Sequence, residues 1–435
     1  MAISSNVHSN NWYVLPNNSS HDEVKSLAVN VDRIIIGFKS INWGRKGLMP
    51  GDNLYLIGGG VYRESLVFEG KGSYEKPIVV DCYGMGECII DGDNVRDYGV
   101  ISRNHGNVSI KNLNIKNHKK SGIRFLGCGS NITIRRNRIT SNGLFGIYVN
   151  SESDECMTIH VRSNRVVDHN VAGIFISANQ NGLVSSVYIE DNEVSHNYLT
   201  VNFGVRWATG IEIYPGFGGN ILNARARDIR IINNQVHDND GTGINIVKNT
   251  KNVVIEKNKV WSNGKKVPAA GIHVGGVLNE FPEKVAIRKN EIWDQTLHIS
   301  DGSGILVDDY SRKIRVERNT AFENEEAGIK LHNTRNVDVD SNTTYKNEVG
   351  IKMASADSFR IINNLLRDQN IGIQIEDKEV KTAIINKNII INVKTPFEIP
   401  KIPEYERFSV LDNCVLFQQK ENFRNLNGNC DSYSR

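Results

Sequence analysis

A short motif that recurs from about residue 100 onward limits the possible folds more than any other feature of the sequence. It reads small residue, Gly, Ile, any residue, apolar residue, and it is followed by a turn, a strand of alternating apolar residues and an Asn. Its glycines are spaced 22 to 37 residues apart. Such a repeat holds two or three strands of about 4–5 residues with turns between them, which predicts one coil of a parallel β-solenoid. The glycines are Gly122, Gly146, Gly173, Gly210, Gly243, Gly271, Gly304, Gly328, Gly350 and Gly372, and the asparagines that keep step with them are Asn137, Asn164, Asn192, Asn234, Asn258, Asn290, Asn319, Asn342, Asn364 and Asn388.

The composition agrees with a solenoid. The 435 residues include 54 Asn and 38 Gly, and Asn and β-branched residues are both unfavourable in helices. No repeat carries the apolar stripe of a helical or leucine-rich repeat. We therefore predict an all-β, single-stranded parallel β-helix over residues 49–392, with an N-terminal cap over 1–48 and a C-terminal cap or tail over 393–435. Asn side chains at matching turns are expected to stack as a hydrogen-bonded ladder.

Charge and hydropathy exclude several classes of protein. The net charge is +3, and no basic run is interleaved with aromatic residues, so nucleic acid is not an expected partner. No apolar run approaches the ~20 residues of a membrane span, and no signal-peptide pattern follows Met1. Cys82 with Cys88, or Cys414 with Cys430, could close small disulfide loops, or these could be free buried thiols. The oligomeric state is not predicted.

Three segments near the N-terminus carry a family resemblance. They are Pro50-Gly-Asp-Asn-Leu-Tyr-Leu-Ile-Gly-Gly-Gly-Val-Tyr-Arg-Glu64, Lys76-Pro-Ile-Val-Val-Asp81 and Ile89-Ile-Asp-Gly92. With the repeats behind them, they resemble the opening coils of the right-handed β-helix polysaccharide lyase superfamily, which includes chondroitinase B-like, alginate and pectate lyase-like enzymes and mannuronan epimerases. The Asp-Pro-His-Glu signature of those epimerases is missing, as are the Gly-His-Gly and Arg-Ile-Lys signatures of polygalacturonases. The resemblance implies a right-handed coil, an acidic polysaccharide as partner and an extracellular, cell-surface or periplasmic location.

Strand alternation predicts which residues face outward on one long sheet. In each Gly-Ile-x-apolar-x strand, the Ile and the next apolar residue point inward, so the two x positions point outward. Coils stack about 4.8 Å apart, so we expect Glu212 and His273 to lie about 10 Å apart and Asp308 and His332 about 5 Å apart. The first outward column is Arg124, Tyr148, Phe175, Glu212, Asn245, His273, Leu306, Lys330, Lys352 and Gln374, and the second is Leu126, Asn150, Ser177, Tyr214, Val247, Gly275, Asp308, His332, Ala354 and Glu376.

Ionisable residues concentrate between Glu212 and His332, and the three longest repeats fall between Gly173 and Gly304, around the same stretch. Loops on a rigid scaffold often bind ligands, and aromatic rings stack on sugars, so we predict a glycan-binding groove there. β-Elimination needs a base for the proton α to a uronate carboxylate, a group that stabilises the enolate and an acid for the leaving oxygen. The candidates for base and acid are His273, Lys330 and Tyr214, with Glu212, Asp308 and His332 also in the groove. Substrate contacts are expected from Arg206, Trp207, Asn245, Asp240 and Phe217.

Other chemistries stay open at this point. Asp301, Asp308 and Asp309 offer acidic oxygens that could hold Ca²⁺. A glycoside hydrolase would need two carboxylates within about 5–9.5 Å, which Glu212 with Asp238 or Asp240 could provide. An epimerase or a non-catalytic, phage-type glycan-binding spike would present the same face. Our leading hypothesis is a polysaccharide lyase.

Overall fold

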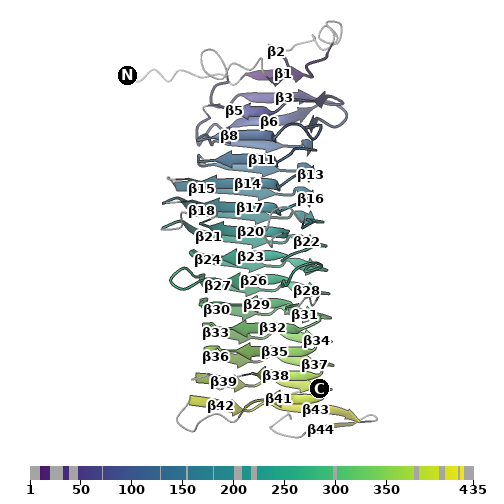
Figure 1. Cartoon of the computed structure of the whole chain (residues 1–435), viewed down its shortest axis with the longest axis vertical. Coiled ribbons are helices and arrows are strands. Elements are labelled where there is room, and N and C mark those ends of the chain that lie inside the picture. The colour runs from purple at the N-terminus through teal and green to yellow at the C-terminus, as the bar shows by residue number, and fades with distance from the viewer. Residues whose placement is uncertain are drawn as a thin grey trace. The chain divides into compact units, whose positions relative to one another are not determined.

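A computed structural model describes residues 10–19, 33–38, 48–70, 72–127, 129–152, 155–179, 181–199, 208–216, 223–296, 301–376, 382–400, 407–419 and 422–425. The chain divides into two compact units, Met1–Glu193 with Gly216–Arg225, and Val194–Pro215 with Ala226–Arg435. Every regular element in the described residues is a β-strand (Figure 1). Within that part of the chain, no helix is long and apolar enough to cross a membrane.

In the first unit, the chain visits three parallel sheets in turn, once per coil. Consecutive coils pair strand on strand, which is the pattern of a β-helix. Sheet A contains β2 (Arg33–Ile36), β1 (Asn11–Leu15), β3 (Asn53–Ile57), β6 (Ile78–Tyr83), β9 (Val108–Lys111), β12 (Ile132–Arg135), β15 (Glu155–Arg162) and β18 (Leu183–Glu190). Sheet B contains β4 (Val61–Tyr62), β7 (Ile89–Asp91), β10 (Asn114–Lys116), β13 (Arg138–Asn142) and β16 (Arg165–His169). Sheet C contains β5 (Leu66–Phe68), β8 (Tyr98–Arg103), β11 (Ser121–Leu126), β14 (Phe145–Ser151) and β17 (Ala172–Ala178). A disulfide joins Cys82 to Cys88.

The second unit repeats this architecture, and β19 (Glu193–Ser195) lies at its start. Sheet A contains β21 (Arg225–Ile232), β24 (Thr250–Glu256), β27 (Glu283–Arg288), β30 (Arg312–Glu317), β33 (Arg335–Asp340), β36 (Asp357–Ile362), β39 (Thr382–Asn386) and β42 (Arg407–Leu411). Sheet B contains β22 (Gln235–His237), β25 (Lys259–Trp261), β28 (Glu291–Trp293), β31 (Thr320–Phe322), β34 (Thr343–Tyr345), β37 (Leu365–Arg367), β40 (Ile389–Ile391) and β43 (Cys414–Gln419), with β44 (Asn422–Asn425) antiparallel to β43. Sheet C contains β20 (Thr209–Pro215), β23 (Ile244–Val247), β26 (Ile272–Gly275), β29 (Ile305–Val307), β32 (Ala327–His332), β35 (Val349–Ala354), β38 (Ile371–Ile375) and β41 (Thr395–Glu398).

The Gly-Ile motifs form the strands of sheet C, and their register follows the predicted outward column. Ile272 and Val274 of β26 are completely buried, whereas the His273 side chain between them is 22% exposed. Paired residues continue this column in the second unit as Glu212, Asn245, His273, Leu306, Lys330, Lys352 and Gln374. Gly271 has no space for a side chain, because a Cβ there would lie 2.5 Å from Ile292 Cγ2 and 2.8 Å from the Gly304 carbonyl. The all-β parallel coil predicted from the repeat is confirmed.

The predicted asparagine ladder is present and buried in both units. In the second unit, Asn290 Oδ1 accepts a hydrogen bond from the Asn258 backbone N–H (2.9 Å), and Asn290 Nδ2 donates to the Ile255 carbonyl and to Asn319 Oδ1 (both 2.9 Å). A second ladder, which the sequence reasoning did not find, stacks Asn239, Asn263, Gln295, Asn324, Asn347 and Gln369.

Residues outside the predicted 49–392 coil also join the sheets. β1 pairs in parallel with β3, and β41 and β42 pair in parallel with β38 and β39.

Candidate active site

The candidate site lies on the outer face of sheet C in the second unit. Two adjoining cavities of about 290 and 450 Å³ open there, and His273, Thr242 and Pro268 line both. We call these the first and second cavities, and together the groove. The first is also lined by Glu212, Tyr214, Asn245 and Lys248, and the second by Asp301, Leu306, Asp308, Lys330 and His332. The groove therefore coincides with the stretch from Glu212 to His332 that the sequence predicts.

A chain of polar contacts runs along this groove across five neighbouring coils. Asn245 Nδ2 donates to Glu212 Oε1 (2.8 Å), and His273 Nδ1 lies 2.6 Å from Asn245 Oδ1. His273 Nε2 lies 3.9 Å from Asp308 Oδ2, and His332 Nδ1 lies 2.6 Å from Asp308 Oδ1. The predicted proximity of Asp308 and His332 is confirmed. Asn245 separates Glu212 from His273, as expected for residues two coils apart.

These contacts fix the orientation of the His273 ring. An amide oxygen only accepts hydrogen bonds, so Nδ1 of His273 carries the proton that Asn245 Oδ1 accepts. At 3.9 Å, Nε2 is too far from Asp308 for a hydrogen bond. In a neutral imidazole, Nε2 therefore keeps its lone pair, on a residue that lines both cavities. The ring also occupies space that a side chain at Gly275 would fill, because a Cβ there would lie 2.5 Å from His273 Nε2.

Glu212 is an acid in an environment that opposes its charge. The residue is 1% exposed, and its Oε2 has no hydrogen-bond partner among the described residues. Burial raises the pKa of Glu212 to about 8, although hydrogen bonds with Thr209 and Asn245 lower it. The carboxyl is thus protonated at neutral pH and able to donate a hydrogen bond.

We expect Glu212→Gln to remove a pH dependence of stability. The unfolded chain releases this proton near pH 4.5, the ordinary pKa of Glu, whereas the folded protein holds it to about pH 8. Folding therefore takes up a proton between these values, so wild-type stability falls as the pH rises from about 5 to 8. In thermal unfolding, the Tm of Glu212→Gln should rise relative to wild type over that range. Glu398→Gln, which changes an exposed carboxylate paired with Gln374 on sheet C, is the control. Identical pH profiles for wild type and Glu212→Gln would contradict the assignment.

The pKa of the Asp308 carboxyl is lowered, in contrast to that of Glu212. Burial opposes its charge, but the charge of the nearby His273 imidazole and the hydrogen bonds with His332 and the Asp309 backbone outweigh burial and lower the pKa of Asp308 to about 2. The Asp309 backbone N–H also donates to Asp308 Oδ1 (2.7 Å). Asp308 is thus an ionised carboxylate beside two imidazoles.

A second acid–base cluster lies at the edge of the second cavity. Lys330 Nζ is 2.8 Å and Lys352 Nζ is 3.1 Å from Glu326 Oε1, and Ser303 Oγ donates to Glu326 Oε2 (2.9 Å). Burial raises the pKa of Asp301, and the neighbouring Glu326 carboxylate reinforces this. Although burial acts against it, the pKa of Glu326 is lowered by hydrogen bonds and charge from Lys330 and by hydrogen bonds from Ser303 and Lys352. Lys330, expected as a base or acid, is thus held in an ion pair.

The remaining predicted residues lie in different places. Tyr214 lines the first cavity with Lys248, whose Nζ lies 4.8 Å from the centre of its ring. Asp240 is buried, accepts a hydrogen bond from the Leu199 backbone (2.9 Å) and pairs with Lys266 (2.8 Å), so it does not line either cavity. Asp238, the other partner considered for Glu212, contacts His237 and Lys265 instead. Arg206, Trp207 and Phe217 lie outside the described residues.

The sequence reasoning missed Lys248 and Glu326. Lys248 directly follows strand β23, one residue past the outward column, and has a φ of 54° that turns the chain. Glu326 lies two residues before Gly328, close to the place that Asp301 takes before Gly304. Acidic residues just before the repeat glycines were the signal available for Glu326.

The residues considered for calcium do not form one oxygen shell. Asp308 and Asp309 offer atoms within 4.8 Å of each other, but the third member of that group is His332. Among the described residues, Asp301 belongs to no such group and lies beside Glu326. Because Ca²⁺ prefers six to eight oxygen ligands, this set does not fit the ion, and we assign calcium no step.

Comparison with known proteins identifies the family to which this fold belongs. The model of the right-handed β-helix region matches residues 93–281, 212–366 and 271–399, which together span more than half of the 435 residues. The chain therefore belongs to the right-handed β-helix family, which confirms the predicted handedness. No curated protein matches the sequence.

Among solved structures, the A-module of the mannuronan C-5 epimerase AlgE6 from Azotobacter vinelandii is 16% identical with a TM-score of 0.55, covering 85% of this chain and 92% of that module. An alginate lyase from Paenibacillus sp. is 14% identical with a TM-score of 0.50, covering 74% and 97%. The GH136 lacto-N-biosidase from Eubacterium ramulus is 16% identical with a TM-score of 0.49, covering 93% and 68%. These are carbohydrate-active enzymes of three reaction types, and at such identities the likeness shows the fold alone.

Proposed function

We propose that this protein is an enzyme that cleaves a uronate-containing polysaccharide by β-elimination. One observation carries the proposal. His273 lines both cavities and holds its Nδ1 proton toward Asn245, so in the neutral ring Nε2 keeps its lone pair. A neutral imidazole held in this way is suited to remove a proton from a bound sugar.

The neighbouring groups supply the other parts of the reaction. His273 Nε2 takes the proton α to the uronate carboxylate. The protonated Glu212 and the Lys248 ammonium, which line the first cavity, stabilise the negative charge that then develops on that carboxylate. We assign the Tyr214 hydroxyl in the same cavity as the acid that protonates the leaving oxygen. The names of the epimerase and the alginate lyase state mannuronan and alginate, which are polymers of this substrate class.

The test is to incubate the protein with a panel of uronate polysaccharides and to follow both ultraviolet absorbance and reducing ends. β-Elimination produces an unsaturated uronate, so both signals should rise together. A change of sugar configuration without cleavage, seen by proton NMR, would replace the lyase by an epimerase. Binding without any product would favour a glycan-binding spike.

A glycoside hydrolase is a second candidate, because two carboxyl groups with opposed pKa shifts line the second cavity. The pKa of Asp301 is raised, and the pKa of Asp308 is lowered to about 2. Such a pair can divide the roles of acid and base or nucleophile. Reducing ends without ultraviolet absorbance, abolished by both Asp301→Asn and Asp308→Asn, would support this reaction.

We also propose that the protein works outside the cytoplasm. The disulfide between Cys82 and Cys88 supports this, because such bonds persist in oxidising compartments. Localising the tagged protein in fractions of its own cells would test the proposal.

A further inference from the structure

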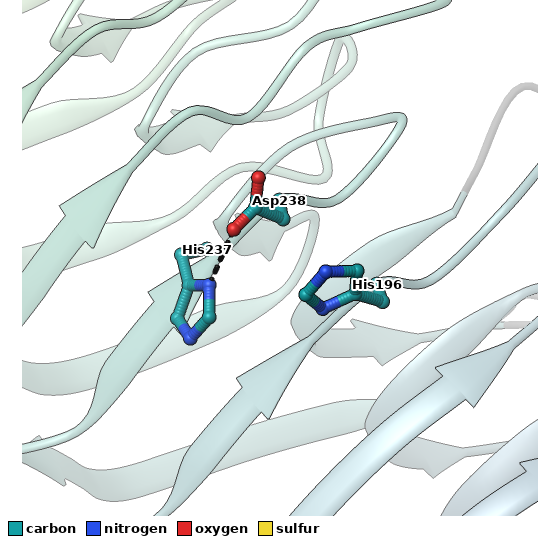
Figure 2. A group of neighbouring side chains, drawn as sticks. All are labelled: His196, His237 and Asp238. Atoms are coloured by element: carbon teal, nitrogen blue, oxygen red, sulfur yellow. Dashed lines mark hydrogen bonds and ion pairs between the residues drawn. The ribbon is translucent and has the colours of Figure 1, made fainter.

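His196, His237 and Asp238 bring two imidazoles and a carboxylate together in the second unit, outside the lining of both cavities. His196 directly follows β19, His237 is the last residue of β22, and Asp238 comes next. The His196 backbone N–H donates to the His237 carbonyl (3.3 Å), so the two histidines lie on neighbouring coils. Figure 2 shows the His196 ring opposite the pair formed by His237 and Asp238. One ligand atom from each residue lies within 4.8 Å of the other two.

The surroundings hold two of these side chains in place. Trp261 stacks on the His237 ring, with centroids 4.1 Å apart and planes 8° apart. His237 Nδ1 lies 2.7 Å from Asp238 Oδ2, a contact that fixes both groups.

His196 has an unused ligand atom. Its Nδ1 is shielded from solvent and has no hydrogen-bond partner among the residues that the structure describes. A buried nitrogen left unpaired in this way is uncommon and costs free energy. An ion bound by this nitrogen would satisfy it.

We propose that these three residues bind a first-row divalent metal ion, with Zn²⁺ as the best match. Two imidazole nitrogens and one carboxylate oxygen are the donors that zinc accepts, at distances of about 2.0–2.2 Å. Calcium and magnesium prefer oxygen ligands alone. Three protein ligands leave a fourth position for water or another ligand. Bound zinc would tie the turn after β19 to the turn after β22.

A lysine competes with the ion for the carboxylate. Lys265 Nζ lies 2.5 Å from Asp238 Oδ1 and neutralises it. A cation at this place opposes a divalent ion both by occupying the oxygen and by repulsion. Replacing Lys265 should therefore strengthen metal binding, whereas losing either histidine should weaken it.

The test uses the full chain, freed of metal by a chelator and titrated with ZnCl₂ in a calorimeter. We expect one equivalent to bind, His196→Ala and His237→Ala to weaken binding at least about tenfold, and Lys265→Ala to tighten it several-fold. Cobalt bound in place of zinc should give a visible absorption band that both histidine variants lose. The Tm of each variant in chelator, compared with wild type, shows that the fold is kept.

Two other histidines serve as controls. His160 stacks on Tyr188 in the first unit, and His332 belongs to the separate group with Asp308 and Asp309. His160→Ala and His332→Ala should keep the zinc equivalent. Failure of the wild type to bind zinc saturably would overturn the site, and so would zinc binding that survives in the double variant His196→Ala/His237→Ala or is lost in His332→Ala alone. None of these readouts depends on polysaccharide cleavage.

Discussion

His273→Ala is expected to lower kcat on the uronate substrate by about 10³-fold, which is within the usual contribution of a general base. The substitution removes the imidazole that lines both cavities. It leaves Glu212, Lys248 and Tyr214, the groups assigned to the substrate carboxylate and leaving oxygen, in the first cavity. KM should therefore change much less than kcat. Initial rates of ultraviolet absorbance at several substrate concentrations would separate the two constants.

Gln374→Ala is the matched control for this experiment. Gln374 faces outward from sheet C in the same column as His273, but it lines neither cavity. It should keep at least about half of the wild-type rate. If His273→Ala also retained a rate close to wild type while its Tm was unchanged, His273 would not be the base. The acid–base assignment would then move to Lys330 and the cluster around Glu326.

The candidate column could be predicted from the sequence because side chains alternate with a period of two and the glycines fix the register. Glu212, Asn245 and His273 were placed on one face by counting from Gly210, Gly243 and Gly271, and the paired strands confirm the order. Counting does not reveal which neighbours a side chain contacts. The contact of Glu326 with Lys330 depends on a turn that brings residue 326 beside its own strand.

The two amide ladders show that prediction from the sequence has the same limit for buried residues. Asn234, Asn258 and Asn290 recur at one place in each repeat, so the first ladder is visible in the sequence. The second ladder follows the first at a constant distance of five residues, but it mixes Asn with Gln, as at Asn263 and Gln295. Both amide types offer a donor and an acceptor, so either can continue a ladder. A search for one residue type misses that equivalence.

Asn290→Ala is expected to destabilise the protein by about 3–5 kcal/mol, since each buried polar group left unpaired costs about 1–3 kcal/mol. Asn290 is 2% exposed, so water does not reach the groups it leaves behind. The substitution removes the acceptor of the Asn258 N–H and two hydrogen bonds that Nδ2 donates, to the Ile255 carbonyl and Asn319 Oδ1. The midpoint of urea unfolding, followed by circular dichroism, should fall accordingly.

Replacing an exposed asparagine is the control that distinguishes the loss of the ladder from the general effect of losing an amide side chain. Asn370 is exposed and donates one hydrogen bond, to Glu348 Oε2 (2.6 Å). Asn370→Ala should change stability by no more than about 0.5 kcal/mol, as surface substitutions usually do. Equal midpoints for the two variants would show that the ladder adds nothing beyond surface hydrogen bonding. A large loss at Asn290 alone would show instead that the buried amides, and not only the apolar residues inside the coil, hold neighbouring coils in register.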